Sequence, residues 1–136
     1  MASERQETLR RLVEIWNSGD FDRFFDLIGP DAEFSPDPSF PDAGTYRGEE
    51  LRRWIGEWNE TWAGSRLEIL DMTDHPHAST MDCRWHLSLP QTHDEIPVDD
   101  FTLVVWFAPE RPDRPTRSAT FFDRERALEE ATERTG

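Results

Sequence analysis

Arg84 and His86 have side chains suited to acid/base chemistry, and they stand two positions apart in the alternating stretch 79–89. Histidine titrates near neutral pH and can act as a general base, while an arginine can stabilise a developing anion. Because side chains alternate across a strand, Arg84 and His86 share one face, and Trp85 and Leu87 the other. Two interpretations stay open: the polar pair faces a binding site, or it faces solvent while the apolar residues fill the core.

The remaining cysteine and histidine residues predict no further chemistry. Cys83 is the single cysteine and lies on the apolar side of the same stretch, which is typical of a small buried hydrophobe. His75 and His77 lie in a turn, without the helical spacing or the cysteine pair that zinc sites use. We therefore expect neither a metal nor a cofactor.

The composition disfavours several classes of partner. The 136 residues contain 29 acidic side chains against 15 basic ones, all of them arginine, for a formal net charge of −14. Such a charge repels phosphate backbones and anionic lipids, so we expect binding neither to nucleic acid nor to a membrane. No apolar run is long enough to cross a bilayer, and the first residues lack the apolar core of a signal peptide. We expect a cytoplasmic protein in which residues 1–136 form one domain.

The first half of the chain predicts three helices and a loop. Ser3 followed by Gln6 is a capping box, and apolar residues then recur at helical spacing. A proline-rich stretch cannot form regular structure and predicts a long loop. The predicted elements are a helix over 4–17, a helix over 21–28 capped by Asp20, a short strand over 31–35, the loop over 36–46, and a helix from 49 to 62 that carries Trp54, Trp58 and Trp62 on one stripe.

The second half has the two-residue period of strands and ends in a short helix. Strands are predicted over 66–73, 79–89, 97–108 and 116–122, with turns between them, and a helix over 124–133. Helices followed by antiparallel strands predict an α+β fold, with three N-terminal helices packed on one face of a curved antiparallel sheet. Residues 97–108 are apolar on both faces, so the outer face must be covered too, most simply by a second copy in a homodimer.

Three motifs resemble SnoaL-like and ketosteroid-isomerase-like members of the nuclear-transport-factor-two-like superfamily. They are the Asn-x-Gly-Asp helix break at 17–20, Pro-Asp-Ala at 30–32 and Tyr-Arg-Gly at 46–48. The similarity continues through the strands to residue 123. This resemblance implies a cystatin-like cone with an apolar pocket, usually in a dimer, but it does not imply one reaction.

The steroid-isomerase-like resemblance implies catalytic roles for two carboxylates. Asp37-Pro38 is similar to the Asp-Pro pair that carries the general base, and Asp99 is similar to the neutral aspartate that donates to the enolate oxygen. One carboxylate then takes a proton while the other, in an apolar site, stays protonated. Leu12 replaces the tyrosine of those isomerases. The alternatives are that Asp37 is a turn residue, and that Asp99 or Asp100 is solvated at a strand start.

Two other branches of the superfamily imply different site residues. In the comparison with limonene-epoxide hydrolases, Arg84 and His86 lie where an Arg and Asp pair stands, and Thr120 lies where a second Asp would be. SnoaL-like cyclases instead imply an acid/base group at Asp37, His86 or Asp99 and a flat apolar ketone as substrate. Residues expected to contact the substrate are Trp16, Trp54, Trp58, Arg84, Asp100 and Thr120, although an aromatic stripe is also typical of a core.

Two functions follow from the sequence. The first is a cofactor-free acid/base enzyme, such as an isomerase, cyclase or dehydratase, acting on an apolar carbonyl compound through Asp37, Asp99 and His86. The second is a non-catalytic module that binds an apolar small molecule or dimerises, favoured by the missing tyrosine and the strand that is apolar on both faces.

Overall fold

Four helices and seven strands make up the fold of the residues that the computed structural model describes, 2–40, 43–62 and 64–132. The helices are α1 (Glu4–Ser18), α2 (Phe21–Ile28), α3 (Gly48–Thr61) and α4 (Arg124–Thr132). The strands are β1 (Glu33–Ser35), β2 (Tyr46–Arg47), β3 (Gly64–Asp74), β4 (Ala78–Ser88), β5 (Glu95–Ile96), β6 (Phe101–Ala108) and β7 (Arg111–Phe121). The predicted helices and strands are thus present. Residues 41–42 of the predicted loop and Glu133 of the predicted last helix lie outside the described residues.

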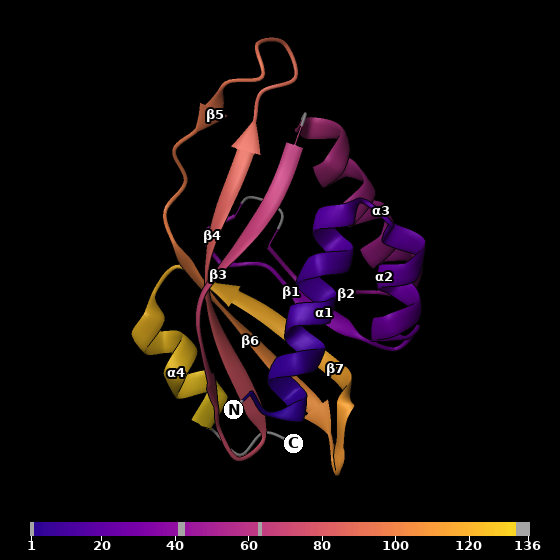
Figure 1. The fold of residues 1–136 in the computed structure, drawn as a ribbon, viewed down its shortest axis with the longest axis vertical. Helices are drawn as coiled ribbons and strands as arrows, with labels where there is room; N and C mark the ends of the chain where they lie inside the picture. The colour runs from indigo at the N-terminus through magenta and orange to yellow at the C-terminus, as the bar shows by residue number, and fades with distance from the viewer. Residues whose placement is uncertain (1, 41–42, 63, 133–136) are drawn as a thin grey trace.

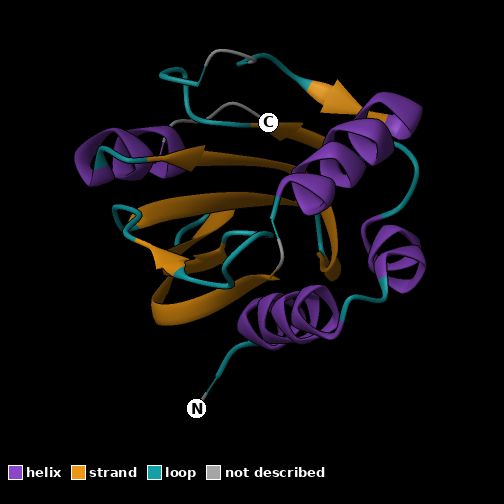
Figure 2. Cartoon of the chain, turned by 90° about the horizontal axis from the view of Figure 1, so that it is seen from above, coloured by secondary structure: helices purple, strands orange, loops and turns teal. Residues whose placement is uncertain are grey.

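The helices lie on both sides of one curved sheet. Figure 1 shows α1, α2 and α3 together on one side and α4 on the other. The view from above in Figure 2 shows the same separation, with the strands running between the two groups of helices. We call the side that faces α1–α3 the inner face and the side that faces α4 the outer face. The expected α+β arrangement of three N-terminal helices on one face of a curved sheet is confirmed.

The sheet is mixed, because one strand pair runs parallel. Its strands follow the order β2-β1-β7-β6-β4-β3, with β5 added beside β4. The long strands β3, β4, β6 and β7 are antiparallel neighbours, as the sequence predicts. In contrast, β1 pairs with β7 in parallel. No hairpin fixes the direction of β1 against β7, since residues 36–110 lie between them.

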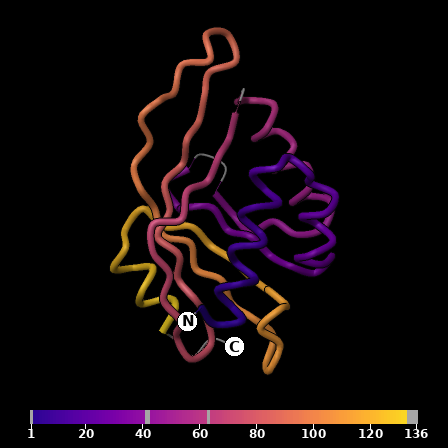
Figure 3. The backbone as a smooth tube through the Cα atoms, in the orientation of Figure 1, coloured from indigo at the N-terminus to yellow at the C-terminus, as the bar shows by residue number. Residues whose placement is uncertain are grey.

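The starts of two strands, β6 and β7, differ from the predicted ones by more than two residues. The segment predicted as strand 97–108 forms β6 only from Phe101, and the prolines between 109 and 115 do not end regular structure, because β7 begins at Arg111. The pairing of β6 with β7 shifts register twice near Phe107. Such irregularities allow Pro112 and Pro115 to remain in the strand without a regular ladder of hydrogen bonds. The connection from β4 through β5 to β6 extends beyond the end of the sheet (Figure 3).

The ends of α1 explain two of the sequence motifs. The capping box is confirmed, since Ser3 and Gln6 exchange side-chain to backbone hydrogen bonds. Gly19 ends the helix with a φ of 81°, a conformation that favours glycine. Just before Gly19, the Asn17 side chain accepts a hydrogen bond from the Leu67 N–H at 2.8 Å and donates one to the Leu67 carbonyl at 3.0 Å. The Asn-x-Gly-Asp motif therefore both ends α1 and attaches it to β3.

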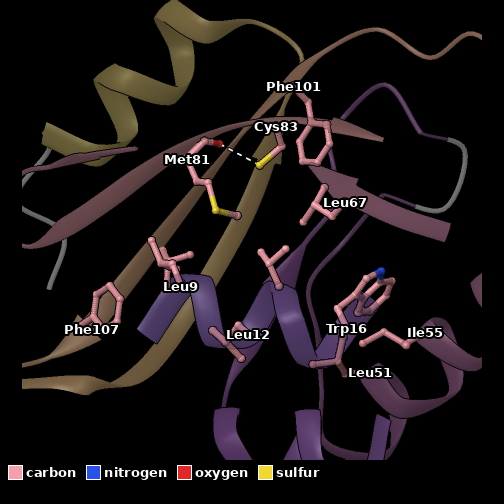
Figure 4. Packing of buried hydrophobic residues seen from close by; sticks show 12 residues of the cluster. Leu9, Leu12, Trp16, Leu51, Ile55, Leu67, Met81, Cys83, Phe101 and Phe107 are labelled. Carbon is pink, nitrogen blue, oxygen red and sulfur yellow. Dashed lines mark hydrogen bonds between the residues drawn. The ribbon is translucent and has the colours of Figure 1, made fainter. Parts of the chain in front are cut away.

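The main hydrophobic core lies between α1–α3 and the inner face. Leu9, Leu12 and Trp16 of α1 belong to one larger buried cluster with Met81 of β4 and Phe107 of β6 (Figure 4). Cys83 is fully buried in the same cluster, as expected for a small hydrophobe, and its Sγ donates to the Met81 carbonyl at 3.2 Å (Figure 4). Burial raises the pKa of the Cys83 thiol, so the group stays protonated.

A second, smaller apolar cluster lies on the outer face. Its members are Ala78, Val104, Trp106, Ala119, Phe121, Ala127 and Ala131, all of them buried. Ala127 and Ala131 come from α4, and Arg124 at the start of that helix bonds the Asp82 carboxylate at 3.2 Å. The outer apolar surface of β6, which led us to expect a second copy of the chain, is thus covered by α4 of the same chain.

Candidate ligand-binding site

A cavity of about 160 Å³ lies between the three N-terminal helices and the inner face of the sheet. Its lining is almost entirely apolar and includes ten aromatic side chains: Trp16, Phe24, Phe34, Phe40, Trp54, Trp58, Trp85, Phe101, Phe121 and Phe122. A cavity of about 150 Å³ with an apolar lining is large enough to bind a benzene molecule. The cavity therefore has the size and character of a site for a ring-sized apolar group.

Stacked aromatic rings form one wall of the cavity. Trp54 and Trp58 are four residues apart on α3, so they lie on the same side of the helix and stack with ring centroids 5.7 Å apart. The Trp58 ring also contacts the Trp85 ring of β4, with centroids 5.7 Å apart. Trp85 in turn stacks on Phe101 at a centroid distance of 5.7 Å. Trp16 contacts Trp85 at 5.8 Å. The three tryptophans expected at the site, Trp16, Trp54 and Trp58, all line the cavity.

Asp37 is the buried carboxylate of the cavity lining. Its exposed fraction is 8%, and it lies in the loop between β1 and β2. The Ser39 N–H donates to Oδ1 at 2.8 Å, and the Phe122 N–H donates to Oδ2 at 2.8 Å. Asp37 thus lines the cavity and also connects its own loop to the end of β7.

The environment of Asp37 favours the ionised carboxylate. Burial by itself raises the pKa of Asp37, but the hydrogen bonds from Ser39 and from the Phe122 N–H outweigh it, and Arg126 adds a smaller electrostatic contribution. The pKa of Asp37 is therefore below its ordinary value. At neutral pH the cavity contains a buried negative charge.

A few uncharged polar groups also line the cavity. Ser118 and Thr120 belong to β7, and both are partly buried. Thr120 pairs with Leu103 and Ser118 with Val105, which places both on the inner face. The indole Nε1 of Trp16 is buried and has no hydrogen-bond partner in the part of the chain that the structure describes. Together with the charged side chains Glu33, Asp37 and Arg117, these groups give the described part of the cavity lining its polar contacts.

Arg84 and His86 lie on the outer face, away from the cavity. Met81 and Trp85 of β4 line the cavity, whereas Arg84 and His86 have the opposite parity and do not. Arg84 forms a two-fold hydrogen bond with Asp100, with N–O distances of 2.9 and 3.0 Å. Of the two interpretations left open by the sequence, the structure therefore supports the second. The apolar side chains of β4 face the interior, and Arg84 and His86 face away from it.

His86 bonds a carboxylate with each of its ring nitrogens. Nε2 lies 2.8 Å from Glu68 of β3, and Nδ1 contacts Glu95 of β5. The hydrogen bonds to Glu68 and then to Glu95 raise the pKa of His86 above its ordinary value. This arrangement joins β3, β4 and β5, and it leaves neither nitrogen directed at the cavity.

Asp99 also lies outside the cavity. It is exposed, in the segment between β5 and β6, and it does not belong to the lining.

Of the nine residues proposed for the site from sequence, the structure brings five together at the cavity: Trp16, Asp37, Trp54, Trp58 and Thr120. It places the other four elsewhere: Arg84, His86, Asp99 and Asp100.

Some lining residues were not among those expected. Trp85 could have been found from strand parity, since it lies on the apolar face of the stretch 79–89. Phe101 could not, because residues 97–108 are apolar on both faces. Phe40 and Phe122 could not, because they come from loop positions without periodicity. Their rings meet edge to face with centroids 5.6 Å apart, and both line the cavity near Asp37.

Among the described residues, no three His, Cys, Asp or Glu side chains are grouped so as to hold a metal ion.

A family model matches most of the chain. Residues 9–111 match the SnoaL-like domain. No curated protein matches the chain.

Within the described residues, we find no helix with both the length and the apolar character needed to cross a bilayer.

Solved structures with little sequence identity have the same fold. An NTF2-like protein of unknown function from Burkholderia pseudomallei is 16% identical, with a TM-score of 0.74 over 97% of this chain and 100% of that one. A hypothetical protein with a ketosteroid isomerase-like fold from Catenulispora acidiphila, in complex with trimethylamine, is 10% identical, with a TM-score of 0.69 over 84% and 83%. A candidate SnoaL-like polyketide cyclase from Shewanella denitrificans is 15% identical, with a TM-score of 0.68 over 93% and 95%.

Proposed function

The chain belongs to the SnoaL-like domain family, and we propose that it binds an apolar, ring-containing small molecule in the cavity between its helices and its sheet. The observation that carries this proposal is the aromatic lining with a buried carboxylate at Asp37. Pockets of this composition bury the ring of a ligand and use a few polar groups to orient it. Asp37 is well placed to accept a hydrogen bond from the ligand, because its two oxygens offer about four acceptor positions and the N–H groups of Ser39 and Phe122 and the Ser39 hydroxyl use three of them.

The relatives support small-molecule binding in general. The Catenulispora protein is described in complex with trimethylamine, and the Shewanella protein as a candidate polyketide cyclase. Both have the fold of this chain, although their sequences are too different to transfer a ligand or a reaction.

Filling the cavity is expected to weaken ligand binding. We expect 4-ethylphenol, a neutral single-ring probe, to bind the wild-type protein, and Thr120→Phe to weaken that binding by about tenfold or more, equivalent to about 1.4 kcal/mol. The reason is that the new ring occupies the space of the ligand. Isothermal titration calorimetry measures both affinities.

Thr116→Phe is the matched control, because it makes the same change on β7 at an exposed position outside the lining. Its affinity should equal that of the wild type. Equal binding by the wild type and Thr120→Phe, or no binding by the wild type, would contradict the proposal.

Acid/base catalysis at Asp37 is a second candidate, favoured because the base expected from the sequence lines the cavity. Asp37 would take a proton from the carbon next to a carbonyl group, and Thr120 or the unpartnered Trp16 N–H would donate to the carbonyl oxygen. We then expect the wild type to catalyse deuterium exchange into 2-indanone, followed by NMR, and Asp37→Asn to lose this activity. Exchange at the rate of the buffer alone in the wild type would leave binding as the function.

A homodimer and a cytoplasmic location stay predictions. The outer apolar face that suggested the dimer is covered by α4, so a dimer would have to use another surface. Its test is the mass of the wild-type protein in solution at micromolar concentration, measured by light scattering.

A further inference from the structure

The charged side chains of the cavity lining bear on which ligand the cavity favours. Of its described lining residues, three carry a formal charge: Glu33, Asp37 and Arg117. The Glu33 carboxylate pairs with the Arg47 guanidinium at 3.2 Å, and both side chains are partly exposed at the edge of the sheet. That pair is electrically balanced and contributes little net charge to the cavity.

The arginines near the cavity do not neutralise Asp37 by direct contact. The guanidinium of Arg117 lies 3.8 Å from the centre of the Trp106 ring, which belongs to the buried cluster on the outer face. Arg126 acts on Asp37 electrostatically, but it is an exposed residue of α4. Within the described residues, Asp37 is hydrogen-bonded by the N–H groups of Ser39 and Phe122 and by the Ser39 side chain, and by no guanidinium.

The aromatic walls add to the negative character of the cavity. The face of an aromatic ring is electron-rich and attracts cations, most strongly for tryptophan. Trp54 and Trp58 stack with an interplanar angle of 18°, and Trp85 stacks on Phe101 with the same angle. Burial in a medium of low polarity strengthens the attraction between a cation and both the rings and the carboxylate.

We propose that the cavity selects a ligand that carries a positive charge on a body the size of one aromatic ring, with the cation at Asp37 and the ring against the tryptophans. This inference rests on the binding function proposed above and adds the charge of the ligand to it. A protonated amine fits best, because its N–H groups can donate to the Asp37 oxygens. A carboxylate ligand is disfavoured, because it would be buried beside a like charge.

Three probes that share one ring and differ in charge test the inference: tyramine, 4-ethylphenol and 4-hydroxyphenylacetate. Calorimetry at pH 7 and 0.15 M salt should show tyramine binding about tenfold more tightly than 4-ethylphenol, the factor expected from one charge-assisted hydrogen bond after desolvation. The anion should bind most weakly. In Asp37→Asn the preference for tyramine over 4-ethylphenol should disappear.

Asp71→Asn is the matched control, since it removes one exposed carboxylate that is not part of the lining. It should keep the tenfold preference, which separates the effect of Asp37 from that of the net charge of −14. If 4-ethylphenol binds and tyramine binds no better, the cation inference is overturned while the binding function stands. If none of the probes binds, both are overturned. These wild-type comparisons decide the question even if Asp37→Asn does not fold.

Discussion

Replacing Ala127 by aspartate should lower the free energy of unfolding by about 3–5 kcal/mol, the cost of an unpaired charge in an apolar interior. Ala127 is fully buried where α4 packs on the outer face of the sheet, in contact with the cluster that contains Val104 and Trp106. The chain can avoid this cost only by releasing α4, which exposes that cluster to water. Urea unfolding followed by circular dichroism measures the loss.

Released α4 would also change how the protein associates. The exposed Val104, Trp106, Ala119 and Phe121 would form an apolar patch of the kind that drives association. We therefore expect Ala127→Asp to elute as larger species than the wild type in size-exclusion chromatography. Glu129→Asp, at an exposed position of the same helix, should stay within about 0.5 kcal/mol of the wild type. Wild-type stability in Ala127→Asp would show that α4 contributes nothing to the fold.

Removing the Asp37 carboxylate should lower the free energy of unfolding by about 2–4 kcal/mol, because Asp37→Ala leaves two backbone N–H groups without an acceptor. These are the N–H groups of Ser39 and Phe122, both 2.8 Å from the carboxylate. Asp37→Asn should lose less, since its carbonyl oxygen can still accept one of the two. Urea unfolding at pH 7 gives both values, and equal stability of Asp37→Ala and wild type would contradict the assignment.

The contribution of Asp37 should also depend on pH. A carboxylate whose pKa is lower in the folded state stabilises the fold above its unfolded-state pKa, near 3.8, and that stabilisation is lost as the pH falls through the lower folded-state value. The stability difference between wild type and Asp37→Asn should therefore be constant from pH 7 to about pH 5 and shrink below pH 4. A difference that does not change down to pH 2 would show that the ionised form has no special role.

Periodic elements were the part of the fold that could be predicted from sequence. The helical spacing of α1 and α3 and the two-residue period of β4 each depend on side chains close together in the chain, so a local pattern is enough. The parallel pairing of β1 with β7 and the docking of α4 depend on segments far apart, and the apolar side of α4 consists mainly of alanines. Alanine carries little signal, yet Ala127 and Ala131 fit closely against the sheet.

The site was harder to predict than the fold, for a physical reason. Tryptophans on a helical stripe can be assigned to the interior from their spacing. Trp16, Trp54 and Trp58 were expected at the site on this basis. A polar residue at a strand or loop position can equally face a cavity or solvent. Asp37 and Asp99 have similar local sequence signals, but the Phe122 N–H binds one of them into the cavity lining, and that contact spans 85 positions.

The bond between Asn17 and Leu67 has a consequence for solubility. β3 is an outermost strand of the sheet, and such a strand can recruit a strand from another molecule through its free backbone groups. Asn17 occupies both the N–H and the C=O of Leu67, and a bulge interrupts the strand two residues later, between Ile69 and Asp71. At the opposite border, β2 is two residues long. An incoming strand therefore finds no long regular border to pair with, which protects this sheet against growth into aggregates.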